Sequence, residues 1–348
     1  MSAAPSPIRV LIIDDSPLIR SSYRMLLEAA PGFEVVGEAG DPYEAREVIL
    51  AAQPDVITLD VEMPRMDGIT FLRRLMQFRP TPVVVISAVA GRGSAMAVEA
   101  LHIGAAEVVD KPATALARQR FGPTLVDALR AAVMSRPQPR VGGPAVALTA
   151  PPAATLIAIG ASTGGPAQLL EVLPRLPGDL PPVVIVQHMP EGFTRAFADR
   201  LARASGHDVK EAQSGEVLKH GCFRVAPGGK HLVLAGLASS PRTVVQEGPM
   251  INFHRPSVDL FFQSVVRSCG ASAVGVILTG MGEDGARGLL SMRQAGATTI
   301  GQDEASSIVY GMPRAAYEIG AVARQVGISA LPAALVEAVR ARAHEHGR

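Results

Sequence analysis

The stretch LIAIGASTGGPAQLLEV, residues 156–172, contains an apolar run, a glycine-rich turn and a helical pattern in immediate succession. The apolar run predicts a buried strand, and the apolar spacing after Pro166 predicts a helix. A strand that turns directly into a helix is the first half of a βαβ unit, so the stretch predicts a parallel α/β sheet. The turn places Ser162 at the carboxyl end of the predicted strand, where such sheets bind their ligands.

Two kinds of glycine loop compete for residues 160–165. A dinucleotide-binding turn requires G-x-G-x-x-G, but Ser162 stands at the second glycine, and a P-loop requires a Gly-Lys pair that this loop lacks. The loop does match G-x-S-x-G, the pattern around the nucleophilic serine of α/β-hydrolases. That pattern is common by chance, and a lone serine in a glycine turn is most often a helix cap. The loop pattern alone therefore does not identify Ser162 as a nucleophile. A base and an acid near Ser162 would be needed as well.

A histidine and an aspartate follow two other predicted strands. His188 ends the run PVVIVQH, and Asp284 lies in the loop TGMGEDG after the run AVGVIL. Because the carboxyl ends of parallel strands share one edge, we expect Ser162, His188 and Asp284 to meet there. The imidazole can take the serine proton, and the carboxylate can orient the imidazole. The order Ser, His, Asp differs from the order in α/β-hydrolases, which predicts a different fold.

Further residues near Ser162 could take part in its chemistry. The backbone N–H groups of Thr163 and Gly164 are candidates for stabilising an oxyanion. His254 is the second candidate for the base. Taken singly, His188 fits a hydrogen-bonded strand end and Asp284 fits a helix cap. No metal or cofactor is expected for chemistry at Ser162.

Five apolar runs alternate with helical patterns in the first part of the chain: IRVLII, FEVVGEA, DVITL, PVVVIS and AEVV. This alternation predicts a flavodoxin-like, five-stranded parallel domain over residues 8–134. Residues 155–345 predict a second doubly wound, mostly parallel α/β sheet with an antiparallel hairpin region. Between them, residues 135–154 are rich in proline and glycine and predict a linker.

Charged side chains follow the strands of the first domain. Asp14 and Asp15 follow the first strand, Asp60 ends the third, Ser87 ends the fourth and Lys111 follows the fifth. Three convergent carboxylates repel one another and need a cation, and such an oxygen site suits Mg²⁺. Lys111 and Ser87 are then donors for a phosphoryl group. Each acid alone also fits a helix cap, but the whole set favours a phosphoryl site.

Composition narrows the class of protein. The 348 residues exceed one ordinary domain, and a net charge of +1 favours neither nucleic acid nor anionic lipid as a partner. Cys222 and Cys269 are too few for a disulfide framework, so we expect buried thiols in a reducing cytoplasm. Neither a signal peptide nor a membrane-inserted segment is expected.

The motifs LIIDDSP, TLDVEMPRMDG, VVVISA and VVDKP, in this order, resemble the response-regulator receiver family. The resemblance implies phosphorylation of Asp60 by a partner histidine kinase. It also implies a metal site made by Asp14, Asp15, Asp60 and the Glu62 carbonyl, with Ser87 and Lys111 as switch residues. Many receivers carry a rotating aromatic residue where this chain has Val108, which puts the aromatic half of that switch in doubt.

The second half resembles the catalytic domain of chemotaxis protein-glutamate methylesterases (CheB-type). The matching motifs are IGASTGGP, VVIVQHMP, VAPGGKHL, HRPSVDLFF, LTGMGEDGA and GQDEASSIVYGMPRAA. The resemblance implies Ser162 as nucleophile, His188 as general base and acid, and Asp284 as orienting carboxylate. It implies a phosphorylation-activated hydrolase that demethylates, and also deamidates, the cytoplasmic helices of methyl-accepting chemoreceptors. The alternative is a receiver-linked adaptor module with a vestigial catalytic site.

Overall fold

The computed structural model describes residues 6–63, 67–87, 92–112, 115–135, 145–148 and 154–341. The chain divides into two compact units, Met1–Pro137 and Gln138–Arg348. Most of the linker predicted over residues 135–154 lies outside the described residues. Each unit has its own buried apolar core, so each is described by itself.

The first unit contains one parallel sheet. Its strands are β1 (Ile8–Ile13), β2 (Phe33–Ala39), β3 (Val56–Asp60), β4 (Val83–Ser87) and β5 (Glu107–Asp110). The spatial order is β2-β1-β3-β4-β5, and every neighbouring pair is parallel. This is the flavodoxin-like order, and the predicted fold of this unit is confirmed.

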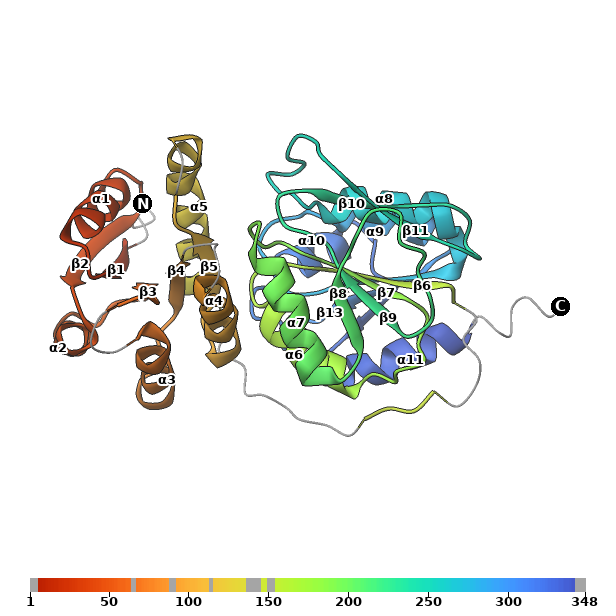
Figure 1. Ribbon diagram of the computed structural model, residues 1–348, viewed down its shortest axis with the longest axis horizontal. Coiled ribbons are helices and arrows are strands. Elements are labelled where there is room, and N and C mark those ends of the chain that lie inside the picture. Colours follow the sequence, from red (N-terminus) through yellow and green to blue (C-terminus); the bar gives the residue numbers. More distant parts are fainter. Residues whose placement is uncertain are drawn as a thin grey trace, which may run out of the picture. The chain divides into compact units, whose positions relative to one another are not determined.

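Five helices cover the two faces of this sheet (Figure 1). They are α1 (Pro17–Glu28), α2 (Pro42–Ala52), α3 (Gly68–Phe78), α4 (Arg92–Ile103) and α5 (Ala115–Met134). Helices α1 and α5 pack together over one core, where Tyr23 stacks on Phe121 at 5.0 Å between ring centroids. Helix α5 begins at Ala115, because the residues before Phe121 are strong helix formers.

The second unit contains a seven-stranded sheet and a separate hairpin. The sheet strands are β6 (Leu156–Ala161), β7 (Val183–Gln187), β8 (Asp208–Glu211), β9 (Cys222–Val225), β12 (Ala273–Ile277), β13 (Thr298–Gln302) and β14 (Arg324–Val326). Their order is β14-β13-β12-β6-β7-β9-β8, with parallel pairing throughout, and the hairpin joins β10 (His231–Ala235) to β11 (Arg242–Gln246). The predicted parallel sheet with an antiparallel hairpin is confirmed.

Helices pack on both faces of the second sheet (Figure 1). They are α6 (Gly165–Val172), α7 (Phe193–Ser205), α8 (Val258–Cys269), α9 (Ala286–Gln294), α10 (Met312–Glu318) and α11 (Leu331–Ala341). The apolar residues of α8, α9 and α10 share a core with the hairpin and one sheet face, and α6, α7 and α11 lie on the other face. No helix within the described residues is long and apolar enough to cross a membrane.

The order of the strands locates a crevice in the second unit. From β6 the chain goes first to β7 on one side and returns later to β12 on the other side. Connections that leave a central strand in opposite directions open a crevice at the carboxyl ends of the strands. The loops after β6, β7 and β12 surround this crevice, and they carry the residues predicted to react.

Candidate functional site

Ser162 lies directly after β6 and is held by its backbone. Its N–H donates to the Thr279 carbonyl at 2.9 Å, and its carbonyl accepts from Gly165 N at 2.8 Å. The buried Gln187 side chain donates to the same carbonyl at 2.9 Å. A Cβ at Gly280 would lie 2.6 Å from the Ser162 Cβ, so only glycine allows this approach. The serine is 6% exposed and sits in a fixed turn.

His188 lies beside Ser162 because their strands are paired. Ala161 and Gln187 are register partners in β6 and β7, and His188 N donates to the Ala161 carbonyl at 3.0 Å. Neighbouring parallel strands lie about 4.8 Å apart, so the next residue on each strand is within side-chain reach. Within the described part of the chain, no hydrogen bond joins Ser162 Oγ to His188.

The His188 imidazole is bound to Asp284 through one nitrogen. Nε2 lies 2.9 Å from Asp284 Oδ2, and Nδ1 is buried without a hydrogen-bond partner among the described residues. Nδ1 is therefore the nitrogen left for a proton transfer with Ser162. The predicted approach of the histidine and the aspartate is present in the structure.

Asp284 is almost fully buried and accepts several hydrogen bonds. Besides His188, its donors are Val258 N at 2.7 Å, Ser257 Oγ at 2.9 Å, Asn252 Nδ2 at 2.8 Å and Asp259 N at 3.3 Å. Burial acts to raise the pKa of Asp284, but the hydrogen bonds from His188, Asn252 and Val258 outweigh it and hold this pKa below its usual range. The carboxylate is thus kept ionised in a fixed orientation.

Several of these partners were not predicted from the sequence. Asn252, Ser257 and Asp259 come from the segment before α8 and from its first turn, and none of them ends a predicted strand. The only signal for them was that Ser257 and Asp259 lie within the motif HRPSVDLFF. His254, the second candidate for the base, does lie in the site, where its ring stacks on His188 with 3.6 Å between centroids.

The predicted oxyanion donors lie at the start of α6. Gly164 is the N-terminal cap of this helix and has a φ of 80°, and a Cβ there would lie 2.6 Å from the Ile308 Cβ. Ser162 N and Gly165 N already donate to backbone carbonyls. The N–H of Gly164 has no acceptor among the described residues, as is usual for a backbone N–H at the start of a helix.

The acids of the first unit also converge. Asp14, Asp15 and Asp60 each offer one carboxylate oxygen within 4.8 Å of the others. Lys111 Nζ lies 2.5 Å from Asp60 Oδ2 and 3.4 Å from Asp14 Oδ2. Asp14 and Asp60 are almost fully buried, whereas Asp15 is exposed.

The other predicted residues of this cluster lie at neighbouring strand ends. Ser87 is fully buried, and its carbonyl accepts from Lys111 N at 2.9 Å. Glu62 N donates to Asp60 Oδ1 at 3.1 Å, which places the Glu62 backbone beside the acids. Val108 is buried in β5, so no aromatic ring occupies that position.

The carboxylates of the first unit accept fewer hydrogen bonds than the carboxylate of Asp284. Burial raises the pKa of Asp14, whose buried Oδ2 has the Lys111 ammonium at 3.4 Å and no well-formed hydrogen bond among the described residues. Burial likewise raises the pKa of Asp110 to about 6. Burial acts to lower the pKa of Lys111, but the hydrogen bond and the charge of Asp60 outweigh it and raise this pKa. Three carboxylates that converge with only one long ion pair to Asp14 Oδ2 fit a hard divalent cation.

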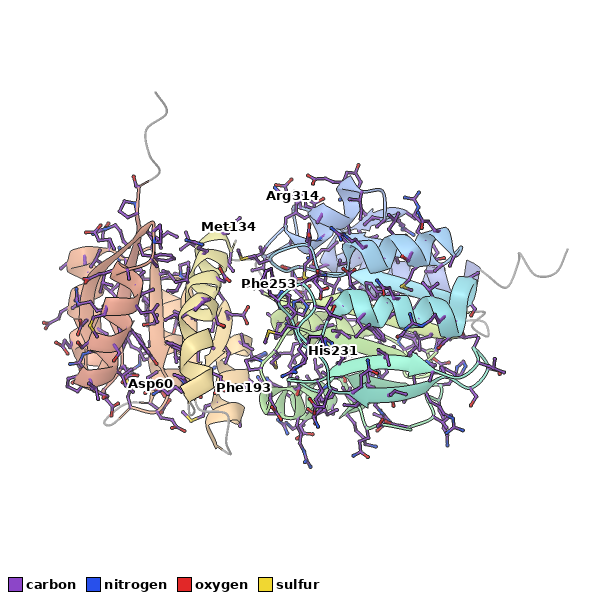
Figure 2. All side chains as sticks on the ribbon, turned by 90° about the horizontal axis from the view of Figure 1, so that it is seen from above. Asp60, Met134, Phe193, His231, Phe253 and Arg314 are labelled. Carbon is purple, nitrogen blue, oxygen red and sulfur yellow. The ribbon has the colours of Figure 1, made fainter. Side chains whose placement is uncertain are left out.

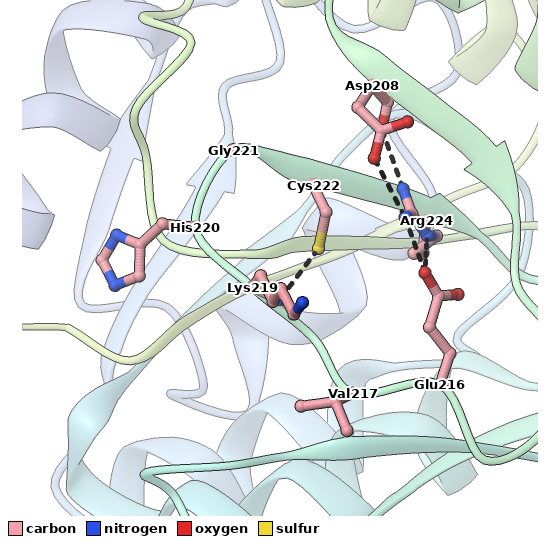
Figure 3. Close-up of a pocket in the computed structure, with 8 residues that line it drawn as sticks. All are labelled: Asp208, Glu216, Val217, Lys219, His220, Gly221, Cys222 and Arg224. Carbon is pink, nitrogen blue, oxygen red and sulfur yellow. Dashed lines mark hydrogen bonds and ion pairs between the residues drawn. The ribbon is translucent and has the colours of Figure 1, made fainter.

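A pocket of about 520 Å³ opens elsewhere in the second unit (Figure 3). It lies at the starts of β8 and β9, the opposite end of the parallel strands from Ser162. Its buried Arg224 already pairs with Asp208 at 3.0 Å and with Glu216 at 2.6 Å. The pocket therefore offers no free cation from Arg224 and plays no part in the site around Ser162.

Comparison with known families assigns a family to each of the two units. The family described as CheB methylesterase matches residues 157–335, and the response regulator receiver domain matches residues 10–118. A relative from Anaeromyxobacter dehalogenans named protein-glutamate methylesterase/protein-glutamine glutaminase 4 is 48% identical, over 94% of this chain and 95% of its own. A relative from Caulobacter vibrioides with the same name, numbered 1, is 47% identical over 96% of this chain and 99% of its own.

A solved structure supports the same assignment for the second unit. The crystal structure of the Thermotoga maritima CheB methylesterase catalytic domain is 37% identical, with a TM-score of 0.52. The match covers 53% of this chain and 98% of that one. With a receiver domain before this catalytic domain, the chain belongs to the CheB methylesterase family.

Proposed function

We propose that the protein is a phosphorylation-activated hydrolase that demethylates glutamate methyl esters, and deamidates glutamines, on methyl-accepting chemotaxis receptors. The observation that carries the proposal is the hydrogen bond between His188 Nε2 and the buried Asp284, with Ser162 at the neighbouring strand end. The names of the relatives supply the substrate class. The substrate segment is the cytoplasmic helical region of the receptor.

The proposed reaction begins at Ser162. His188 Nδ1 takes the Ser162 proton while Oγ attacks the ester carbonyl carbon, which becomes tetrahedral and carries an oxyanion. Asp284 keeps the proton on Nε2 and stabilises the imidazolium. The N–H groups of Thr163 and Gly164 donate to the oxyanion, an effect worth about 3 to 4 kcal/mol per donor in comparable enzymes.

The second half of the reaction releases the products. The tetrahedral intermediate collapses, the bond to the methoxy oxygen breaks, and the His188 imidazolium returns its proton so that methanol leaves. Water then loses a proton to Nδ1 and attacks the Ser162 acyl group, which yields the glutamate and the free serine. With a glutamine side chain, ammonia leaves in place of methanol.

In the first unit we propose that Asp60 accepts a phosphoryl group from the phosphohistidine of a chemotaxis kinase. Asp14, Asp15, Asp60 and the Glu62 carbonyl would hold Mg²⁺. The ion supplies charge neutralisation for the phosphoryl oxygens when it is bound. Lys111 and Ser87 would donate to the same oxygens after the transfer. Lys111 must then leave its ion pair with Asp60, and this exchange is the proposed start of the switch.

The test is methanol release from a methylated chemoreceptor, measured for the wild type and for Ser162→Ala, each with and without a small-molecule phosphodonor. We expect release that requires Ser162 and that rises with the phosphodonor. Equal release by Ser162→Ala would remove the serine mechanism. No release by any form would favour the adaptor alternative.

A further inference from the structure

The turn Ile251–His254 contributes two side chains to the site for which the proposed reaction has no role. The turn closes through mutual backbone bonds, Ile251 N to His254 O at 3.1 Å and His254 N to Ile251 O at 2.9 Å. Asn252 and Phe253 have φ values of 50° and 66°, a conformation that costs free energy for residues other than glycine. The contacts of the turn must therefore compensate for this cost.

Asn252 links the two buried carboxylates of the site. Its Nδ2 donates to Asp284 Oδ1 and to Asp259 Oδ2, both at 2.8 Å. Asp259 is in turn fixed by Gly288 N at 2.6 Å. Because two buried carboxylates repel each other, an amide that donates to both holds them in one arrangement. Asn252 therefore restrains the carboxylate that orients His188.

His254 restrains the imidazole itself. Its ring lies nearly parallel to the His188 ring, at an interplanar angle of 11° and a centroid distance of 3.6 Å. A single hydrogen bond at Nε2 leaves an imidazole free to tilt, and a stacked ring removes this freedom. Burial and the neighbouring His188 hold the pKa of His254 well below its usual range, so the stacked ring stays neutral. A neutral ring face attracts the imidazolium that forms on His188.

We propose that Asn252 and His254 are positioning residues, which fix Asp284 and His188 so that Nδ1 faces Ser162. The inference rests on the proposed esterase function. It assigns His254 a role other than that of an alternative base. Phe253, labelled in Figure 2, lies between these two residues in the chain and is 92% exposed, so it provides a matched control from the same turn.

The test compares four variants of the full chain. His254→Ala removes the stack, and His254→Phe keeps a flat ring without nitrogens. Asn252→Gly removes the amide but keeps a residue that tolerates the left-handed backbone. Phe253→Ala alters the exposed part of the turn. Methanol release gives kcat and KM, and proton NMR follows the hydrogen-bonded proton between His188 and Asp284.

We expect His254→Ala and Asn252→Gly to lower kcat on the order of 10- to 100-fold with little change in KM, and to broaden or shift the His188 proton resonance. His254→Phe should recover most of the loss, and Phe253→Ala should keep the wild-type kcat. Unchanged kcat and resonance in His254→Ala and Asn252→Gly would overturn the proposal.

A His254→Phe variant as slow as His254→Ala would also overturn the stacking role, because a ring nitrogen would then be needed. If His254→Ala fails to fold, Asn252→Gly decides the question. If the wild type releases no methanol, the proposed function fails, but the NMR comparison still tests the positioning role.

Discussion

Asp284 and Asp14 are both buried aspartates at the carboxyl ends of parallel sheets, but their surroundings differ. Asp284 accepts hydrogen bonds on both oxygens, and its pKa is held below the usual range. Asp14 Oδ2 has only a 3.4 Å ion pair with Lys111 among the described residues, and burial raises the pKa of Asp14. The carboxylate of Asp284 is fixed by donors of its own unit, whereas the carboxylates of the first unit converge and repel one another.

This difference fits the roles proposed above, a catalytic site in the second unit and a switch in the first. A catalytic carboxylate that is satisfied beforehand needs no rearrangement during the reaction. A ligand or a modification shifts the equilibrium between two conformations only if it stabilises one of them more than the other. A switch therefore needs an unfavourable arrangement of charges that the ligand or the modification can relieve. The following experiments test this contrast, from the largest expected effect to the smallest.

The largest effect is expected for Asp284→Asn. The amide does not hold His188 with its proton on Nε2, so kcat should fall about 10³- to 10⁴-fold, as for comparable triads. The unfolding free energy of the second unit should fall by about 3 kcal/mol, because a buried network of donors loses its anion. Kinetics and denaturant unfolding followed by hydrogen exchange measure both. The exposed neighbour substitution Glu283→Gln should change neither, and an active Asp284→Asn would contradict the assigned role.

Lys111→Met tests the acidic cluster of the first unit. It removes the ammonium 2.5 Å from Asp60 and 3.4 Å from Asp14 and leaves two buried carboxylates facing each other. The unfolding free energy of the first unit should fall by about 2 kcal/mol. Stimulation by a phosphodonor should be lost, with basal methanol release retained. Arg73→Met, which breaks an exposed ion pair, should cost less than about 1 kcal/mol.

Mg²⁺ should stabilise the first unit alone. At ten times its dissociation constant, an ion that binds only the folded state adds about 1.4 kcal/mol to the unfolding free energy. Hydrogen exchange of β1 and β3 amides, with and without Mg²⁺, measures this gain, and Na⁺ at equal ionic strength controls for screening. Asp14→Asn should abolish the gain. Equal stabilisation of the second unit would show that the effect is not specific.

The smallest effect is expected at Asp110, whose pKa burial raises to about 6. A raised carboxyl pKa favours the protonated form in the folded state. Below pH 4, Asp110 is protonated in both the folded and the unfolded state, and its burial costs no free energy of ionisation. Between pH 4 and 6 the cost of ionising Asp110 in the folded state grows, and above pH 6 the folded state bears the whole cost. Since the side chain is partly exposed, Asp110→Asn should stabilise the first unit by on the order of 1 kcal/mol at pH 7 and not at pH 4. A gain that persists at pH 4 would contradict this cause.

The sequence predicted the residues that follow strong strands. Ser162, His188 and Asp284 could be placed together because parallel strands end at one edge, and the acids of the first unit followed by the same argument. β14 and α10 were not predicted, since they are short and contain few apolar residues in a regular pattern.

The part of the site that escaped prediction has a different origin. Asn252 reaches Asp284 through a left-handed turn, and the stacking of His254 on His188 depends on the path of that turn. Neither the left-handed turn nor the ring stacking produces a periodic pattern of residues in the sequence. The choice of Nδ1 over Nε2 also follows only from where Asp284 binds the ring.

The two border strands of the seven-stranded sheet bear on how the protein behaves when it is concentrated. β8 reads DVKE and β14 reads RQV, and both are short and mostly charged or polar. A border strand with unpaired backbone groups can template the addition of another chain, and short charged strands oppose this. The largest sheet of the molecule is thereby protected against intermolecular strand pairing and against fibril growth from its margins.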